Sequence, residues 1–268
     1  AAGTYDILLI KYDPSGNVSW AKSVGSTGDD AGYNTVVDAG GNVYITGWFN
    51  SPSVTFGTTT LSNAGSGNDM FAAKYDSSGN VIWAKGAGGT GSEAGYDVAV
   101  DANNNVYVTR AFDSPGLTFG STVLTNAGLS DVYLVKYDVL GNIVRANNVG
   151  GSYDDAGNSI FVDVSGNVYI TGRFSSAAIL FGSTTLTNVS AGSNDIFLVK
   201  YDDSGNVLWA KSAGGSYSDV GSSIVVGSSD GIYITGRFDS PTLVFGSTTL
   251  YKGCGNDFLV VALSNPVG

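Results

Sequence analysis

The chain has 268 residues, a formal net charge of −11 at neutral pH, 12% aromatic residues and no histidine. This length is sufficient for one large all-β domain with a buried core. The negative charge argues against a nucleic-acid surface or an anionic-membrane surface, because both need clustered lysine and arginine. The lack of histidine removes the usual neutral-pH base and the commonest metal ligand.

The first repeat shows a pattern of short strands. Residues 6–12 form an apolar run that predicts a strand buried on both faces, which we name type C. A turn at 13–17 with Pro, Gly and Asn leads to a type D strand at 18–22. The segment 33–38 predicts a type A strand, which turns into a type B strand at 43–49. No apolar pattern of helical period is found, so no helix is expected.

An insert of roughly 18 residues separates each B strand from the next C strand. In every copy, apolar residues flank a Gly-Ser or Gly-Thr turn, a pattern that predicts a small extra hairpin packed by its Phe and Leu side chains. The four predicted hairpins lie at 54–61, 117–124, 180–186 and 244–250.

One stretch of sequence recurs along the whole chain at a nearly fixed period. It is clearest at 69–85 and 195–211, as Asp-x-Phe-x-x-Lys-Tyr-Asp-x-x-Gly-Asn-Val-x-Trp-Ala-Lys. Other copies begin at Asp6 and Asp131, and a degraded fifth copy begins at Asp257, so the spacings are 63, 62, 64 and 62 residues. A fixed period of this kind marks a repeat architecture.

A four-stranded antiparallel unit repeated around an axis is a β-propeller blade. The sequence therefore predicts an all-β fold, a β-propeller of four blades with four antiparallel strands and one extra hairpin each. We expect a single domain over 1–268. Its repeats are 6–68, 69–130, 131–194 and 195–256, followed by a closing strand at 257–263.

The repeat motif resembles the bacterial β-propeller repeat family usually labelled SBBP. The resemblance rests on the 17-residue stretch and on Val-Asp-Ala-Gly-Gly-Asn-Val-Tyr-Ile-Thr-Gly at 37–47, and it covers nearly the whole chain. It implies a secreted or surface-attached bacterial protein whose repeats serve as scaffolds or binding modules. The third repeat departs from the motif at Arg145, which replaces tryptophan, and the fourth departs at Gly227, which replaces aspartate.

The chain begins and ends on the same strand type, so it has one more C strand than four blades need. The extra strand leaves three alternatives. The first is a closed ring with a fifth outer strand, the second is a strand donated to a neighbouring molecule, and the third is a piece of a longer array.

One acid precedes each A strand and is the best positional candidate for a metal site. In a propeller the innermost strands begin beside the axis, so four such carboxylates could form a ring that binds Ca²⁺. The alternative, which we favour, is that each acid caps backbone N–H groups of its own loop. These acids are Asp30, Glu93, Asp155 and Asp219. The turn aspartates Asp13, Asp76, Asp138 and Asp202 are expected to form hairpin turns rather than calcium loops.

A second set of positions varies between repeats although their geometry is shared. Such variation on one face is typical of a sugar or peptide site, and the alternative is ordinary drift of exposed positions. The candidates are Tyr33, Tyr96, Trp48, Arg173 and Arg237. The tryptophans of the D strands, Trp20, Trp83 and Trp209, are predicted to pack blades together.

Catalysis is disfavoured, because the chain has no Gly-x-Ser-x-Gly elbow, no phosphate loop and no histidine to activate a serine or Cys254. As Cys254 is alone, no intrachain disulfide is expected. No apolar run approaches 18 residues, so no membrane insertion is expected.

We therefore expect a non-enzymatic, extracellular or cell-surface structural and adhesive module that self-associates through its redundant strand. The runner-up is a carbohydrate- or peptide-binding propeller that uses one face. The third alternative is a glycoside hydrolase with paired aspartates at 29–30 or 154–155.

Overall fold

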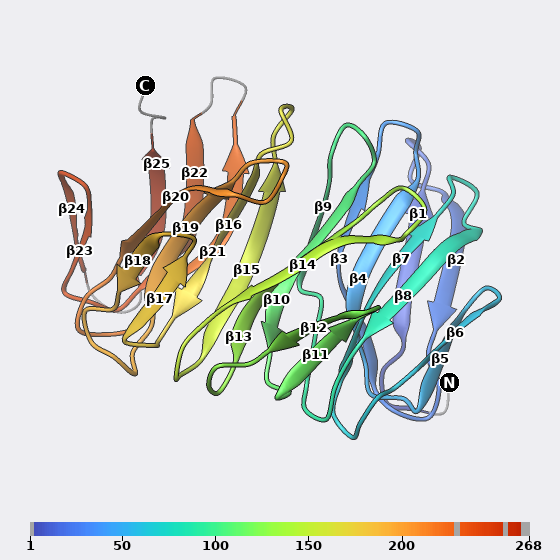
Figure 1. Cartoon of the computed structure of the whole chain (residues 1–268). Helices are drawn as coiled ribbons and strands as arrows, with labels where there is room; N and C mark the ends of the chain where they lie inside the picture. Colours follow the sequence, from blue (N-terminus) through green and yellow to red (C-terminus); the bar gives the residue numbers. More distant parts are fainter. Residues whose placement is uncertain (1–2, 228–230, 254–256, 264–268) are drawn as a thin grey trace. The chain divides into compact units, whose positions relative to one another are not determined.

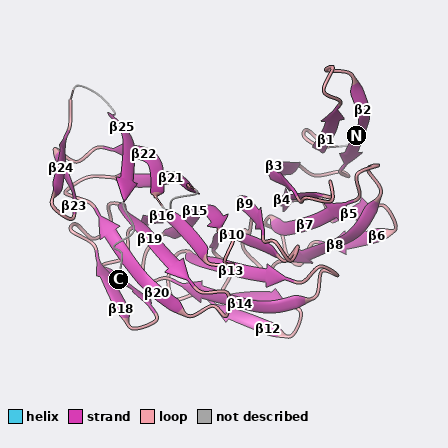
Figure 2. Ribbon diagram, turned by 90° about the horizontal axis from the view of Figure 1, so that it is seen from above, coloured by secondary structure: helices cyan, strands magenta, loops and turns pink. Residues whose placement is uncertain are grey.

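A computed structural model describes residues 3–227, 231–253 and 257–263 (Figure 1). These residues form strands, turns and loops without a helix, which confirms the all-β class (Figure 2). Within them no helix is long and apolar enough to cross a membrane. Cys254 and the segment after 263 lie outside the described residues.

The chain divides into two compact units. The first unit contains 1–125 and 134–147, and the second contains 126–133 and 148–268. The boundary passes through the second repeat sheet. The single domain expected from the sequence stays a prediction.

The structural repeat is one sheet of strands A, B, C and D with its insert, so it begins at strand A, whereas the sequence repeats above begin at strand C. In the first unit, the first complete structural repeat forms a four-stranded sheet in this order, and a separate C–D hairpin precedes it. The predicted insert is a two-stranded hairpin. The elements are the hairpin β1 (Ile7–Tyr12) and β2 (Val18–Val24), the sheet β3 (Asp30–Val37), β4 (Val43–Phe49), β7 (Asp69–Tyr75) and β8 (Val81–Ala87), and the insert β5 (Ser53–Phe56) and β6 (Thr59–Ser62).

The second repeat sheet has the same order, but its A strand is short. Its strands are β9 (Asp97–Val100), β10 (Val106–Phe112), β13 (Asp131–Tyr137) and β14 (Ile143–Val149), with the insert β11 (Gly116–Phe119) and β12 (Thr122–Thr125).

In the second unit, the third repeat is complete, whereas the fourth has three strands in the described part of the chain. The third contains β15 (Asp155–Val162), β16 (Val168–Phe174), β19 (Asp195–Tyr201) and β20 (Val207–Ala213), with the insert β17 (Ala178–Phe181) and β18 (Thr184–Thr187). The fourth contains β21 (Asp219–Val226), β22 (Ile232–Phe238) and β25 (Asp257–Leu263), with the insert β23 (Thr242–Phe245) and β24 (Thr248–Tyr251).

The C strands form the most buried part of each complete sheet, as their apolar runs predict. All seven residues of β7 are buried, and so are all seven of β13. One face of β7 packs on its own insert, where the rings of Phe56 and Phe71 lie 5.0 Å apart. The predicted role of the insert side chains is therefore confirmed for this repeat.

The A–B turn explains why Asp, Asn and Tyr recur at fixed positions of the motif. The carboxylate of Asp38 accepts hydrogen bonds from the backbone N–H and the side-chain amide of Asn42, at 2.9 and 2.8 Å. The buried hydroxyl of Tyr44 donates to the same carboxylate at 2.9 Å. Repeats two and three form the same Tyr–Asp bond, through Asp101 and Asp163. At Gly227 the fourth repeat has no carboxylate to form it.

The C–D turns are Asx turns, as predicted in preference to calcium loops. Asp76 accepts N–H bonds from Ser78 and Asn80 at 2.9 and 2.8 Å, and Gly79 takes the positive φ of 82°. These bonds hold the pKa of Asp76 below its usual value. The equivalent bonds from Asn to Asp recur at Asp13, Asp138 and Asp202.

The D-strand tryptophans reach the C–D turn of the following repeat in the first unit. The indole N–H of Trp20 donates to the carbonyl of Ser77 at 3.1 Å, and that of Trp83 donates to Val139 at 3.2 Å. Gly79 permits the first of these contacts, because a Cβ there would lie 2.9 Å from the Trp20 ring. For Trp20 and Trp83 the predicted packing role is confirmed.

Strand β3 begins three residues before its predicted start at 33, because a β-bulge interrupts the apolar–polar alternation of the sequence. The pairing passes from Gly32↔Gly47 to Asn34↔Thr46, so Tyr33 is the extra residue of the bulge. The same shift occurs at Gly157/Ser159 and at Gly221/Ser223.

We expect Gly47→Ala to destabilise the protein by about 1–3 kcal/mol, as overpacked interiors do. A Cβ at Gly47 would lie 2.0 Å from the carbonyl oxygen of Ala31, and the backbone cannot retreat without breaking the bulge. Urea unfolding measures the loss. The control is Gly116→Ala, whose Cβ would meet its nearest neighbour at 3.4 Å. Equal losses for the two variants would contradict the prediction.

Candidate functional site

A buried acid begins the A strand of three sheets, and in the second sheet Glu93 precedes the A strand β9; each of these acids ties two loops together. Asp30 is fully buried, and its Oδ2 accepts the Ser26 N–H at 3.0 Å and the Ser51 hydroxyl at 2.6 Å. Its Oδ1 accepts the Ser51 N–H at 3.1 Å. The carboxylate therefore links the D–A loop to the residues that follow strand B.

The other three acids make equivalent bonds. The hydroxyls of Ser176 and Ser240 donate to Asp155 and Asp219, each at 2.7 Å. Glu93 accepts the N–H groups of Gly89 and Ser114 at 2.9 and 3.2 Å. These are the bonds that the capping alternative predicts.

The serines in this arrangement were missed by sequence reasoning. All four are buried, and each stands two residues after the phenylalanine that ends a B strand. The recurring Phe-x-Ser pattern could therefore have predicted these serines from the sequence. They are Ser51, Ser114, Ser176 and Ser240.

A calcium ring built from the four acids stays a prediction. Over 3–227, 231–253 and 257–263, no three His, Cys, Asp or Glu side chains are grouped as a metal ion would need. The amide and hydroxyl donors around Asp30, Asp155 and Asp219 already supply the hydrogen bonds that a cation would have to displace.

A second buried carboxyl begins each complete C strand, and sequence reasoning did not single it out. Asp69, Asp131 and Asp195 are 2%, 1% and 1% exposed. In each, Oδ2 accepts one backbone N–H, at 2.7, 3.1 and 2.9 Å respectively. The Oδ1 atoms of the three residues are buried and have no hydrogen-bond partner in the described protein. Such a site disfavours the charged form of the carboxyl.

The buried carboxyl that begins a C strand and the buried acid at the A strand of the following sheet influence each other electrostatically. Burial, followed by the nearby charge of Asp219, raises the pKa of Asp195 to about 6. Burial also raises the pKa of Asp219, where the hydrogen bonds from Ser240 oppose the shift. Burial raises the pKa of Glu93 in the second repeat, with a smaller contribution from Asp69.

The structure brings together two of the five residues predicted for a ligand face. The rings of Tyr33 and Tyr96 lie 5.0 Å apart at 60°, and they are 49% and 40% exposed. Both follow the buried acid of their repeat, at the position where bulged A strands carry the extra residue. A bulge re-aims its side chain, so this position varies without disturbing the ladder.

Arg110 joins these tyrosines and was missed by sequence reasoning. Its guanidinium lies 4.2 Å from the centre of the Tyr96 ring, which is cation–π geometry. Arg110 stands where the other repeats have Gly47, Gly172 and Gly236. The replacement of this recurring glycine by arginine was the feature of the sequence that could have identified Arg110. The short A strand of this sheet, β9, begins only at Asp97.

The other three predicted ligand residues lie on ladder positions of B strands. Trp48 pairs with Ala31 and is partly buried, and Arg173 pairs with Ala156 and is also partly buried. Arg237 pairs with Val220 and is exposed. A ligand face formed by all five residues stays a prediction.

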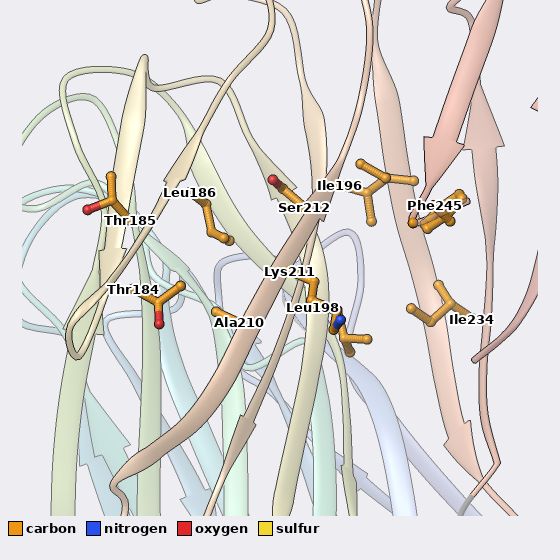
Figure 3. A pocket seen from close by; sticks show the side chains of 12 residues that line it. Thr184, Thr185, Leu186, Ile196, Leu198, Ala210, Lys211, Ser212, Ile234 and Phe245 are labelled. Carbon is orange, nitrogen blue, oxygen red and sulfur yellow. The ribbon is translucent and has the colours of Figure 1, made fainter. Parts of the chain in front are cut away.

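A groove of about 430 Å³ lies between the third and fourth repeats of the second unit. Leu186, Ile196, Ile234 and Phe245 supply its apolar lining (Figure 3). Lys211 places a cation at its border.

No protein-family profile matches the chain. The chain is 25% identical to an uncharacterized WD repeat-containing protein of Acanthamoeba polyphaga mimivirus, over 96% of this chain and 24% of that protein. It is 30% identical to the regulatory protein FlaEY of Caulobacter vibrioides, over 42% of this chain and 12% of that protein. The chain thus spans about a quarter or less of the length of these relatives. The first similarity and the repeated four-stranded sheets together support a propeller-like repeat protein.

We expect Asp195→Asn to stabilise the protein above pH 6. The folded-state pKa is about 6 and the unfolded value is about 3.9. The neutral carboxyl contributes its whole stabilisation below about pH 4, and this stabilisation is lost as the pH rises through 6. The amide variant should therefore gain up to about 3 kcal/mol at pH 8 and almost nothing at pH 4.

Thermal or urea unfolding of both proteins from pH 4 to pH 8 tests this prediction. The matched control is Asp202→Asn. Bonds from Asn206 lower the pKa of this exposed turn carboxylate, so the variant should lose stability at pH 8. A stability change for Asp195→Asn that is independent of pH would contradict the raised pKa.

Proposed function

We propose that the chain is a non-enzymatic protein-interaction module of the propeller type. In this proposal it has four blades, acts as a structural or adhesive component outside the cell or at a bacterial surface, and self-associates through its terminal strands. The named WD-repeat relative and the repeated sheets support the interaction role. The resemblance of the repeat motif to the SBBP family supports a location outside the cell or at a bacterial surface. It also supports membership of the SBBP family.

The observation that carries the proposal is the apolar face of β1. Leu8, Ile10 and Tyr12 are 65%, 36% and 57% exposed, whereas Ile7 and Leu9 on the other face of the same strand are buried. Exposed apolar faces of this kind mark interaction sites. The lack of histidine supports a non-catalytic role.

Sedimentation velocity over a hundredfold range of protein concentration tests self-association. We expect the weight-average sedimentation coefficient to rise with concentration, because buried apolar area favours the associated form by mass action. Added salt should weaken the association little, since the contact is apolar. A constant coefficient of a monomer across the whole range would contradict the proposal.

Carbohydrate or peptide binding is the second candidate, and the cluster of Tyr33, Tyr96 and Arg110 favours it. Two half-exposed aromatic rings and a cation present stacking and hydrogen-bonding groups side by side. A flat sugar or an aromatic peptide side chain fits this chemistry.

Glycan and peptide arrays probed with the labelled chain test this candidate. We expect Tyr96→Ala to weaken the strongest signal about tenfold, because a stacking contact contributes about 1 kcal/mol or more. The control is Tyr153→Ala, which removes a tyrosine that is 45% exposed outside the cluster. Equal signals from both variants would count against the site.

A further inference from the structure

The residues of the Tyr33–Tyr96–Arg110 cluster are replaced in the second unit, although the same strands form there. Tyr33 lies in β3 and Tyr96 directly precedes β9, and these two strands lie next to each other in the first unit (Figure 2). At the two tyrosine positions the third and fourth repeats have Asn158 and Ser222, and both repeats form A strands of eight residues. The repeat therefore does not need the aromatic rings in order to fold.

Two polar side chains beside the tyrosines join the two sheets. They are Asn34 and Asp97, each of which directly follows a tyrosine of the cluster. The amide Nδ2 of Asn34 donates to Oδ1 of Asp97 at 2.6 Å, and the same Oδ1 accepts the backbone N–H of Val98 at 2.9 Å. Asp97 is buried, whereas Asn34 is exposed. The Asn34 amide therefore offers a carbonyl oxygen and a second N–H to a ligand.

The two tyrosine rings form a corner rather than a flat platform. Their planes are 60° apart and their centres are 5.0 Å apart, so one flat ligand cannot stack on both rings. The guanidinium of Arg110 lies 4.2 Å from the centre of the Tyr96 ring and covers one face of that ring. Tyr33 is also the more exposed of the two, at 49% against 40%. Tyr33 therefore has more ring surface available for stacking, and Tyr96 forms the side of the corner.

The charges around this corner disfavour an anionic ligand. Arg110 directly follows Thr109, which pairs with Asp97 in the β9–β10 ladder, so the guanidinium and a buried carboxyl occupy neighbouring positions. The chain as a whole has a formal net charge of −11. The N–H groups of a guanidinium can donate to neutral hydroxyls as well as to carboxylates. A neutral ligand with several hydroxyls can therefore use Arg110 without repulsion from the acids.

We propose that this corner binds one neutral pyranose residue at the end of a glycan. The apolar C–H face of the sugar stacks on Tyr33, and its hydroxyls bond to the amide of Asn34 and to the N–H groups of Arg110. The inference rests on the second candidate function, carbohydrate or peptide binding, and names the class of ligand. A sugar ring has an apolar face and a rim of hydroxyls, which matches an aromatic ring beside an amide and a guanidinium.

Two consequences distinguish a single neutral pyranose from other ligands. A corner holds one sugar ring, so lengthening the glycan beyond its terminal residue should change the affinity little. A linear polysaccharide would instead need several rings in one plane. In addition, a terminal sugar that carries a carboxylate should bind more weakly than its neutral counterpart, because Asp97 and the net charge of the chain oppose it.

Titration of the ¹⁵N-labelled full chain with methyl glycosides tests the ligand class by NMR. The probes are the methyl pyranosides of glucose, galactose and mannose, which differ in configuration at single carbons, and glucuronic acid as the charged comparison. We expect at least one neutral pyranoside to shift the side-chain amide signals of Asn34 in a saturable way, and glucuronic acid to bind several-fold more weakly. If none of the three pyranosides gives a saturable shift, or if glucuronic acid binds more tightly, the inference is overturned.

Four variants identify the residues that bind the sugar. Tyr33→Ala should weaken binding about tenfold, whereas Tyr33→Phe should keep it, because stacking uses the ring and not the hydroxyl. Arg110→Gly should also weaken binding, and it should fold because the other three repeats have glycine at this place. The matched control is Tyr217→Ala, at a tyrosine that is 58% exposed in the second unit. Thermal unfolding shows that each variant is folded.

The outcomes separate this inference from the candidate function on which it rests. Unchanged sugar binding by Tyr33→Ala would overturn the inference, because the sugar would then lie elsewhere. Array signals from peptides without binding of any neutral pyranoside would also overturn it and would leave carbohydrate or peptide binding standing as peptide binding. If neither the arrays nor the titrations show a ligand, both the inference and the second candidate function are removed.

Discussion

The C strands impose the main constraint on this protein, because they are apolar on both faces and have to be covered on both. In the complete repeats one face packs on the insert of the same repeat, as Phe71 packs on Phe56. The other face packs on the next repeat within a unit, as Leu198 packs with Ile224 and Ile234. A single repeat cannot meet this requirement alone, so stability depends on neighbouring repeats. Leu8, Ile10 and Tyr12 of β1 are exposed in the described structure.

Buried acids provide the polar framework around these apolar strands. The acid at the head of each A strand is satisfied by loop amides and a serine, so its burial organises the loops. The acid at the head of each complete C strand keeps one oxygen without a partner. Such groups usually cost stability unless they are neutral, which agrees with the raised pKa of Asp195. The propeller-like repeat thus accommodates carboxyl pairs by weakening their acidity.

Residue types vary most between repeats at positions that form no pair in the β-ladder. The bulge residue of the A strand has no pairing partner, so Tyr33 can be replaced by asparagine or serine in later repeats. A Cβ on Gly47 of strand B would lie 2.0 Å from the carbonyl oxygen of Ala31, and the glycine at this position is absent only in the sheet whose A strand is short. Arg110 and its contact with Tyr96 follow from that single change. The candidate ligand cluster is therefore a local departure from the repeat.

The sequence by itself determined the repeat length, the strand types, the Asx turns and the extra hairpins, because each depends on short-range patterns of apolar, Gly and Asn residues. It also placed the buried acids before the A strands. The bulge, the Phe-x-Ser bonds and the Tyr33–Tyr96–Arg110 cluster could not be read in this way. They join residues that are 12 to 63 positions apart, and their contacts depend on how the loops and A strands fold back on one another. Only the tertiary structure showed that Leu8, Ile10 and Tyr12 of β1 are exposed, since exposure is a property of packing and the apolar sequence of β1 predicts a buried strand.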